Sequence, residues 1–252
     1  MNQSTDDPTA ERRVREDLAA CYRLVAHFHW DDLIYTHISA RVPGHADRFL
    51  INPFGLHFSE ITASSLVTID HEGHKLDDSP HPVNQAGFVI HSAIHKARPE
   101  IACVLHTHTP DGMAVASLAE GLLPLAQQQM LFTHGLTYHD FEGIATDLSE
   151  RERLVRDLGP ASQAMILRNH GLLTAGRTIP EAFLLMYFLQ RSCEIQVKTL
   201  SMGRPLNAVP QAVLDKTFMQ YIMSRQGGET ETPSPWPGLL RLLDRTNPGY
   251  RD

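Results

Sequence analysis

Three histidines in two short segments are the residues of this chain best suited to hold a metal ion. His106 and His108 lie two positions apart at the end of an apolar run, as expected for a buried strand. Side chains at i and i+2 of a strand point to the same face, so both imidazoles can bind one cation. His170 follows a second apolar run and precedes a glycine. Three neutral imidazoles with an open position are typical of a catalytic divalent metal site, and a polar core with satisfied histidines is the alternative.

Length and composition narrow the classes of protein to consider. The chain has 252 residues and a formal net charge of −7, which fits one domain with a tail and lacks the basic balance of a dedicated nucleic-acid binder. No apolar stretch is long enough to span a membrane. Residues 1–13 are polar and charged without an apolar signal region, which predicts a cytoplasmic protein. Cys21, Cys103 and Cys193 lie far apart and are expected to be reduced and structural.

The segments that must position the histidines have the sequence patterns of both strands and helices. Apolar periodicity and Pro or Gly boundaries predict helices over 11–29, 84–96, 110–120, 180–200 and 210–225, and strands over 34–42, 49–52, 66–70, 101–107, 163–167 and 172–174. Strands and helices without regular βα units favour an α/β sandwich with a largely antiparallel sheet. We expect a disordered start over 1–8, one domain over 9–226, and a linker with a C-terminal tail over 227–252.

The order of these motifs resembles the class II aldolase and adducin head superfamily. The matching segments are His37-Ile38-Ser39-Ala40-Arg41, Pro53-Phe54-Gly55, the H-x-H strand and the Asn-His-Gly turn, and residues 51–56, 83–88 and 121–125 are similar to its adducin-like bacterial branch. The resemblance implies a three-layer αβα sandwich and a homotetramer with active sites at subunit interfaces. It also implies that His106, His108 and His170 bind one divalent metal ion per chain. Imidazole ligands alone do not choose between Zn, Mn, Fe and Co.

The chain departs from the sugar-phosphate aldolases of that superfamily at the residues that handle the proton and the phosphate. The family's acid/base glutamate, four residues before a histidine, corresponds to Gly87 here, since that histidine is His91. Gln85 and Ala86 stand where serines would hold a phosphate. Thr36-His37 replaces the Gly-Asn of the phosphate loop, whose backbone needs small residues for a close approach. A sugar phosphate is therefore not the expected substrate.

Other polar residues are candidates for the work of the missing glutamate and for substrate binding. His37 and His91 could move a proton near neutral pH, with His95 one helical turn from His91, and Tyr138 lies in a polar segment expected to be a loop. Arg41 and Arg168 could each bind a carboxylate in bidentate fashion. The further candidates for substrate binding are Asn52, Gly55 and Gln85.

These features favour a divalent-metal-dependent lyase for a non-phosphorylated, carboxylate-bearing small molecule. Both decarboxylation and retro-aldol cleavage leave an enolate that a metal can stabilise as a Lewis acid. Decarboxylation needs no general base to start it, so the absence of the glutamate favours a decarboxylase over an aldolase. Two alternatives stay open: a non-enzymatic adducin-like interaction protein, and a sugar-phosphate aldolase.

Overall fold

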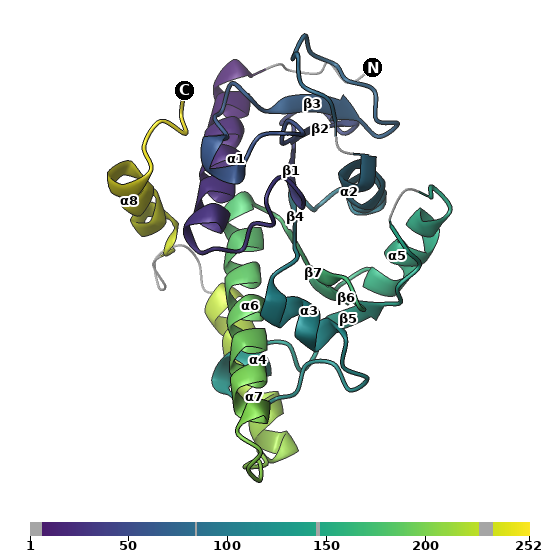
Figure 1. Ribbon diagram of the computed structural model, residues 1–252, viewed down its shortest axis with the longest axis vertical. Helices are drawn as coiled ribbons and strands as arrows, with labels where there is room; N and C mark the ends of the chain where they lie inside the picture. The colour runs from purple at the N-terminus through teal and green to yellow at the C-terminus, as the bar shows by residue number, and fades with distance from the viewer. Residues whose placement is uncertain (1–6, 84, 145–146, 227–233) are drawn as a thin grey trace.

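A mixed sheet lies between two layers of helices in the computed structural model, which describes residues 7–83, 85–144, 147–226 and 234–252 (Figure 1). In these residues the strands run in the order β3-β2-β1-β4-β7-β6-β5, and every neighbouring pair is antiparallel except β5 and β6. The strands are β1 (His37–Arg41), β2 (Arg48–Ile51), β3 (Val67–Asp70), β4 (Cys103–Thr107), β5 (Leu136–His139), β6 (Ala164–Leu167) and β7 (Gly171–Gly176). This architecture confirms the predicted αβα sandwich with a largely antiparallel sheet.

Helices cover both faces of the sheet. The long helices α1 and α6 pack on one face, and α2 and α5 pack on the other (Figure 1). The helices are α1 (Pro8–His27), α2 (Gln85–Ala97), α3 (Pro110–Ala116), α4 (Gln127–Met130), α5 (Glu150–Leu158), α6 (Ile179–Ser201), α7 (Gln211–Gln226) and α8 (Trp236–Thr246), with a 3₁₀ turn at Phe58–Glu60. No helix in the described part of the chain is long and apolar enough to cross a membrane.

The alternation of side chains along β4 decides where its histidines point. Cys103 and Leu105 belong to the core that the sheet forms with α1 and α6, whereas Val104 belongs to the core under α2 and α5. His106 is next but one to Val104, so its imidazole faces the α2 side. The three cysteines of the chain are buried and unpaired, as predicted.

Both ends of the described chain differ in detail from the expectation. α1 begins at Pro8 with Asp7 as its N-cap, while residues 1–6 lie outside the described residues. Of the expected linker and tail, residues 227–233 also lie outside them. The remainder forms α8 and packs on its own chain, because the Trp236 indole donates to Asp17 of α1 at 3.0 Å and Tyr250 is 1% exposed.

Candidate metal centre

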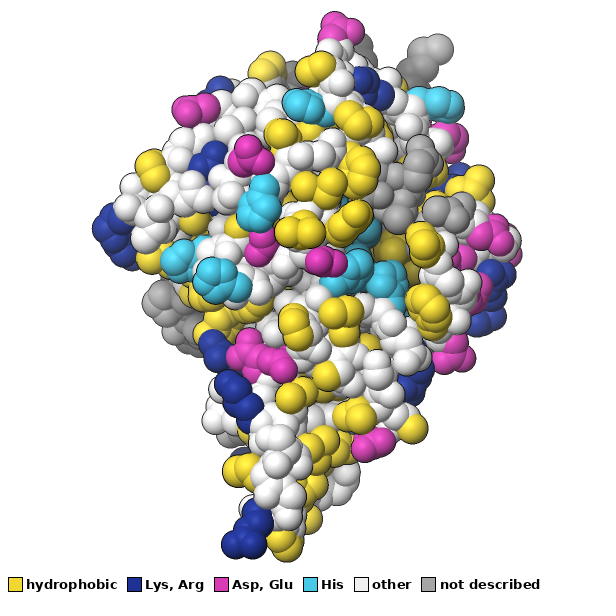
Figure 2. Space-filling view, viewed as in Figure 1, with side chains coloured by type: hydrophobic (Ala, Val, Ile, Leu, Met, Phe, Trp, Pro, Cys, Tyr) yellow, Lys and Arg dark blue, Asp and Glu magenta, His cyan; other side chains and the backbone are white. Residues whose placement is uncertain are grey.

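His106, His108 and His170 form a compact triangle at one end of the sheet. Their ring centroids are 4.6 to 4.8 Å apart, and one nitrogen from each ring lies within 4.8 Å of the other two. His106 is the fourth residue of the fully buried strand β4, and His108 lies between β4 and the N-cap Thr109 of α3. Figure 2 shows a group of histidine side chains near the middle of the displayed face, with hydrophobic and acidic side chains beside it. The structure thus brings together the three predicted ligands.

Hydrogen bonds on the far side of two of the rings prepare them to bind a cation. His106 Nδ1 lies 2.9 Å from the Leu172 carbonyl oxygen, and His108 Nδ1 lies 3.2 Å from a carboxylate oxygen of Asp32. Both partners are acceptors, so each Nδ1 carries the proton and each Nε2 is left with a lone pair. The two Nε2 atoms are 2.8 Å apart. Two lone pairs at that separation repel unless a cation lies between the rings, so this donor set fits a divalent metal ion.

The Asn-His-Gly turn holds the third ligand in place. Asn169 has φ +56°, a left-handed conformation that asparagine tolerates better than most residues. His170 then leads directly into β7, which pairs with β4. A Cβ atom on Gly171 would lie 2.3 Å from the Thr107 carbonyl oxygen and 3.1 Å from the His108 ring. Only glycine allows this close approach of the turn to the histidine strand.

The surroundings keep the imidazoles of His106 and His170 neutral. Burial, followed by the nearby His170, His108 and His37, lowers the pKa of His106 well below its usual 6.5. Burial and His108 lower the pKa of His170 to about 4. Because neutral imidazole is the form that binds metals, these two ligands can bind at neutral pH without losing protons first.

His37 is the candidate for proton transfer that the fold brings to the triangle. It is paired with His106 in the register of β1 and β4, and the two ring centroids are 5.0 Å apart. Its Nδ1 lies 2.7 Å from Nε2 of His91. A Cβ atom on Gly87 would lie 2.8 Å from two ring carbons of His37. The imidazole of His37 therefore occupies the space into which a side chain at position 87 would extend.

Four of the residues predicted to bind substrate lie in β1, in the loop after β2 and at the start of α2. The Arg41 guanidinium donates to backbone oxygens of Ala46 and His95, at the opposite end of β1 from His37. Asn52 is fully buried and accepts a hydrogen bond from Tyr22, which leaves its Nδ2 without a partner in the described structure. Gly55 has φ +108° and open space around it. Gln85 begins α2, and its side chain lies outside the described residues.

Tyr138 lies in β5 rather than in a loop, which corrects the expectation for that segment. Its hydroxyl accepts a hydrogen bond from the Leu122 amide at 3.0 Å, and its ring packs with the core on the α6 side of the sheet. The Arg168 guanidinium stacks on the same ring at 4.6 Å and donates to the Leu118 carbonyl oxygen. Tyr138 thus lies on the α6 side of the sheet, whereas His106 faces the α2 side.

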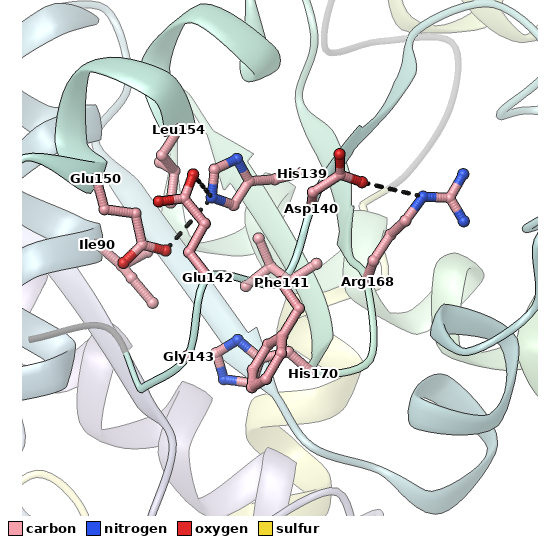
Figure 3. Close-up of a pocket in the computed structure, with 11 residues that line it drawn as sticks. Ile90, His139, Asp140, Phe141, Glu142, Gly143, Glu150, Leu154, Arg168 and His170 are labelled. Atoms are coloured by element: carbon pink, nitrogen blue, oxygen red, sulfur yellow. Dashed lines mark hydrogen bonds and ion pairs between the residues drawn. The ribbon is translucent and has the colours of Figure 1, made fainter.

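A small pocket opens beside His170, and Figure 3 shows the residues that line it. The Phe141 ring lies against His170, with centroids 6.3 Å apart. His139 makes polar contacts with Glu150 and with Asp157 at 3.3 and 2.8 Å. Apolar side chains and titratable groups thus meet at the edge of the metal centre, as is common in sites for small molecules.

Two residues that belong to the site, Asp32 and His139, were not identified from the sequence. Asp32, the partner of His108, lies 76 positions away from it, and nothing in the local sequence connects the two. His139 shares the pocket with His170 but stands in a short strand, β5, that was read as loop. A signal for Asp32 exists only in the backbone: His29, Leu33 and Thr36, which flank it, all have positive φ, and such strain often marks functional loops.

Comparison with known proteins places the chain in a family. Residues 16–197 match the model of the class II aldolase and adducin N-terminal domain. A candidate class 2 aldolase of Pseudomonas aeruginosa is 53% identical over 96% of this chain and 93% of its own length. Alpha-adducin of Rattus norvegicus is 42% identical over 96% of this chain, which corresponds to 34% of the adducin.

Solved structures give the same result. An aldolase II superfamily protein from Pseudomonas syringae has a TM-score of 0.88 at 48% identity, covering 96% of both chains. An L-fuculose 1-phosphate aldolase from Glaciozyma antarctica has a TM-score of 0.83 at 28% identity, covering 100% of this chain and 97% of its own. Since the family model spans most of the sequence and the fold agrees, the chain belongs to the class II aldolase and adducin N-terminal domain family.

Proposed function

We propose that this protein is a divalent-metal-dependent carbon–carbon lyase for a non-phosphorylated, carboxylate-bearing small molecule. Membership of the family and the three-histidine triangle support a metal-dependent lyase. The observation that carries the proposal is the contact between His37 and Gly87, because an imidazole fills the space beside the position at which the resemblance to the sugar-phosphate aldolases implies a glutamate. We favour decarboxylation over retro-aldol cleavage because position 87 carries no carboxylate, and decarboxylation needs no general base to start it.

His106, His108 and His170 would hold the metal ion, with Asp32 and the Leu172 carbonyl fixing two of the rings. When bound, a divalent cation supplies a Lewis acid that stabilises negative charge on a substrate oxygen. Zn, Mn, Fe and Co all accept imidazole ligands, and metal analysis distinguishes them.

His37 handles the proton in this proposal. In the described structure its Nδ1 is engaged by His91, which leaves Nε2 for the reacting molecule. Nε2 can accept the proton of a substrate hydroxyl and return it to the carbon from which carbon dioxide departs. His37 is 3% exposed, so water competes little for that position. Phe141 and Ile90, which line the pocket beside His170, suit a substrate with an apolar or aromatic body.

The test is a screen of hydroxy-substituted aromatic acids, 2-oxo acids and 3-hydroxy acids for metal-dependent release of carbon dioxide or aldehyde. With an active substrate, His108→Ala should abolish turnover. His37→Ala should keep the metal and cut turnover by roughly 10²–10⁴, the usual contribution of general acid–base catalysis. His74→Ala, which changes an exposed histidine that pairs with Asp70 of β3, is the matched control. Wild-type turnover in His37→Ala would contradict the proposed role of His37.

An adducin-like interaction protein is the second candidate function. The 42% identity with rat alpha-adducin over nearly the whole chain favours it. A protein that binds one metal ion per chain yet turns over nothing in the broad screen would favour this role over a lyase.

A further inference from the structure

Two neighbouring carboxylates, Asp31 and Asp32, connect the loop between α1 and β1 to different parts of the fold. Asp32 Oδ2 lies 3.2 Å from Nδ1 of His108, beside the candidate metal centre. Asp31 Oδ2 lies 2.8 Å from Nε2 of His57, in the segment that follows β2. The Asp31 side chain is 14% exposed, whereas that of Asp32 is 44% exposed. The better shielded and more closely paired of the two carboxylates is therefore the one that points away from the histidine strand.

The ring of His57 is held in one orientation by the turn that it begins. His57 is the N-cap of the 3₁₀ turn Phe58–Glu60, and its Nδ1 accepts a hydrogen bond from the Ser59 amide at 3.3 Å. The backbone N–H of His57 donates to Glu60 Oε2 at 2.8 Å, which completes a capping box. Because Nδ1 is the acceptor, the ring proton is on Nε2, and Nε2 donates it to the carboxylate of Asp31.

The loop that carries the two carboxylates has an unfavourable backbone conformation. His29, Leu33 and Thr36 have φ +58°, +53° and +66°, a left-handed region that leucine and threonine seldom adopt. Such strain persists only where the surrounding contacts enforce it. Trp30 supplies one such contact, because it is 5% exposed and its ring stacks on Phe28 at 5.0 Å. Asp31 follows Trp30 directly, so its hydrogen bond with His57 is the next point at which the loop is held.

Holding Asp31 also limits where Asp32 can lie. Consecutive Cα atoms are about 3.8 Å apart across a rigid peptide group, so an anchored Asp31 leaves the Asp32 backbone little freedom. On the other side, the Tyr35 amide donates to the Asp32 carbonyl oxygen at 2.8 Å and closes a tight turn. A pair that is half exposed contributes little when its side chains must first be ordered. A backbone fixed on both sides reduces that cost for the pair of Asp32 and His108.

We propose that Asp31 and His57 are positioning residues that hold Asp32 against His108 and so fix the orientation of the His108 ring in the metal centre. This inference rests on the metal centre that the proposed function requires. It concerns the arrangement of the chain's own side chains, and its readout is the affinity for a metal ion, so no substrate is needed.

The zinc affinity of metal-stripped variants, measured by competition with a chelator, tests the proposal. Asp31→Ala removes the carboxylate. His57→Asn keeps a side chain suited to the N-cap of the 3₁₀ turn but is too short to reach Asp31. Each should lower the affinity by at least about 3-fold, and by no more than the roughly 10–100-fold expected when the Asp32 carboxylate is lost. The two changes together should cost no more than either alone, because they remove the same contact. His57→Gln, whose longer side chain can donate an amide N–H to Asp31, should retain most of the wild-type affinity.

A second background shows whether the effect passes through Asp32. In Asp32→Ala, both Asp31→Ala and His57→Asn should change the zinc affinity by less than about 2-fold. An equal loss with and without the Asp32 carboxylate would overturn the proposal, because a general loosening of the fold acts in both backgrounds. His134→Ala is the matched control, since His134 Nε2 lies 2.8 Å from Asp215 Oδ1 of α7 in an equally short pair. It should keep the wild-type affinity.

The wild-type protein separates this inference from the proposed function. A wild-type protein that binds no zinc or other divalent transition metal would overturn both. Wild-type binding together with undiminished affinity in Asp31→Ala and His57→Asn would overturn this inference alone. Urea denaturation of the metal-free proteins shows which variants fold. If Asp31→Ala does not fold, His57→Asn decides, because it changes a side chain that is 42% exposed.

Discussion

The contact between Gly87 and His37 can be tested by filling the space at position 87. In Gly87→Ala the new Cβ would lie 2.8 Å from Cγ and Cδ2 of His37, against about 3.5–4.0 Å for a comfortable carbon–carbon contact. His37 cannot easily retreat, because His91 holds its Nδ1 at 2.7 Å. Overpacking of this kind costs about 1–3 kcal/mol. Alanine in place of glycine within a helix returns up to about 1 kcal/mol, so the net loss should be about 0–3 kcal/mol.

A double-mutant cycle isolates the contact from the helix effect. In the His37→Ala background the obstacle is gone, and Gly87→Ala should be neutral or stabilising by up to about 1 kcal/mol. The coupling free energy between the two positions should therefore be about 1–3 kcal/mol. Urea denaturation of the metal-free variants at one fixed protein concentration measures it.

Gly238→Ala provides the control, since Gly238 is also the third residue of a helix and its nearest neighbour to a new Cβ, an Arg241 nitrogen, is 3.7 Å away. It should stabilise the protein by up to about 1 kcal/mol. A coupling free energy near zero between positions 87 and 37 would refute the argument that His37 fills the space of the missing glutamate.

Four further predictions follow from the site. Asp32→Asn should lower metal affinity about 10–100-fold, measured by competition with a chelator, and unchanged affinity would show that Asp32 does not support His108. Unfolded histidine has a pKa near 6.5 and folded His95 about 3, so His95 alone should make stability fall by about 1.4 kcal/mol per pH unit below pH 6.5, and His95→Gln should make the overall slope shallower by that amount. Fuculose, rhamnulose and ribulose phosphates should not be cleaved efficiently, and efficient cleavage of any of them would restore the sugar-phosphate aldolase alternative. Light scattering should show a tetramer, as the resemblance to the family implies, and a monomer at micromolar concentration would contradict it; the exposed Leu33 (67%) and Tyr35 (51%) beside Asp32 offer apolar surface for such contacts.

Local sequence patterns predicted the elements that carry the three histidines because those elements are regular and buried. β4 is an unbroken apolar run before His106, and α2 has a clear apolar face. The strand expected from residue 34 begins only at His37, because Thr36 has φ +66° and cannot continue an extended strand. β5 was missed because it lies at the edge of the sheet and three of its four side chains are only half-buried, so its sequence lacks a strand pattern.

The contacts that complete the site come from tertiary packing and have no local signature. The bond between Asp32 and His108 and the approach of His37 to Gly87 each join segments more than 45 positions apart. The type of each residue was visible in the sequence, but the partner was not. The substitution of glycine at position 87 could be noticed from the sequence, whereas the imidazole that explains it required the fold.

The most direct test of the account is the metal content of the protein purified without a chelator or a histidine tag. Elemental analysis should find about one divalent transition metal ion per chain, or uptake of one ion by calorimetric titration of the stripped protein. His108→Ala should lose this binding while remaining folded, and His74→Ala should retain it. A folded wild-type protein that neither contains nor takes up Zn, Mn, Fe, Co or Ni would contradict the assignment of His106, His108 and His170 as a metal centre.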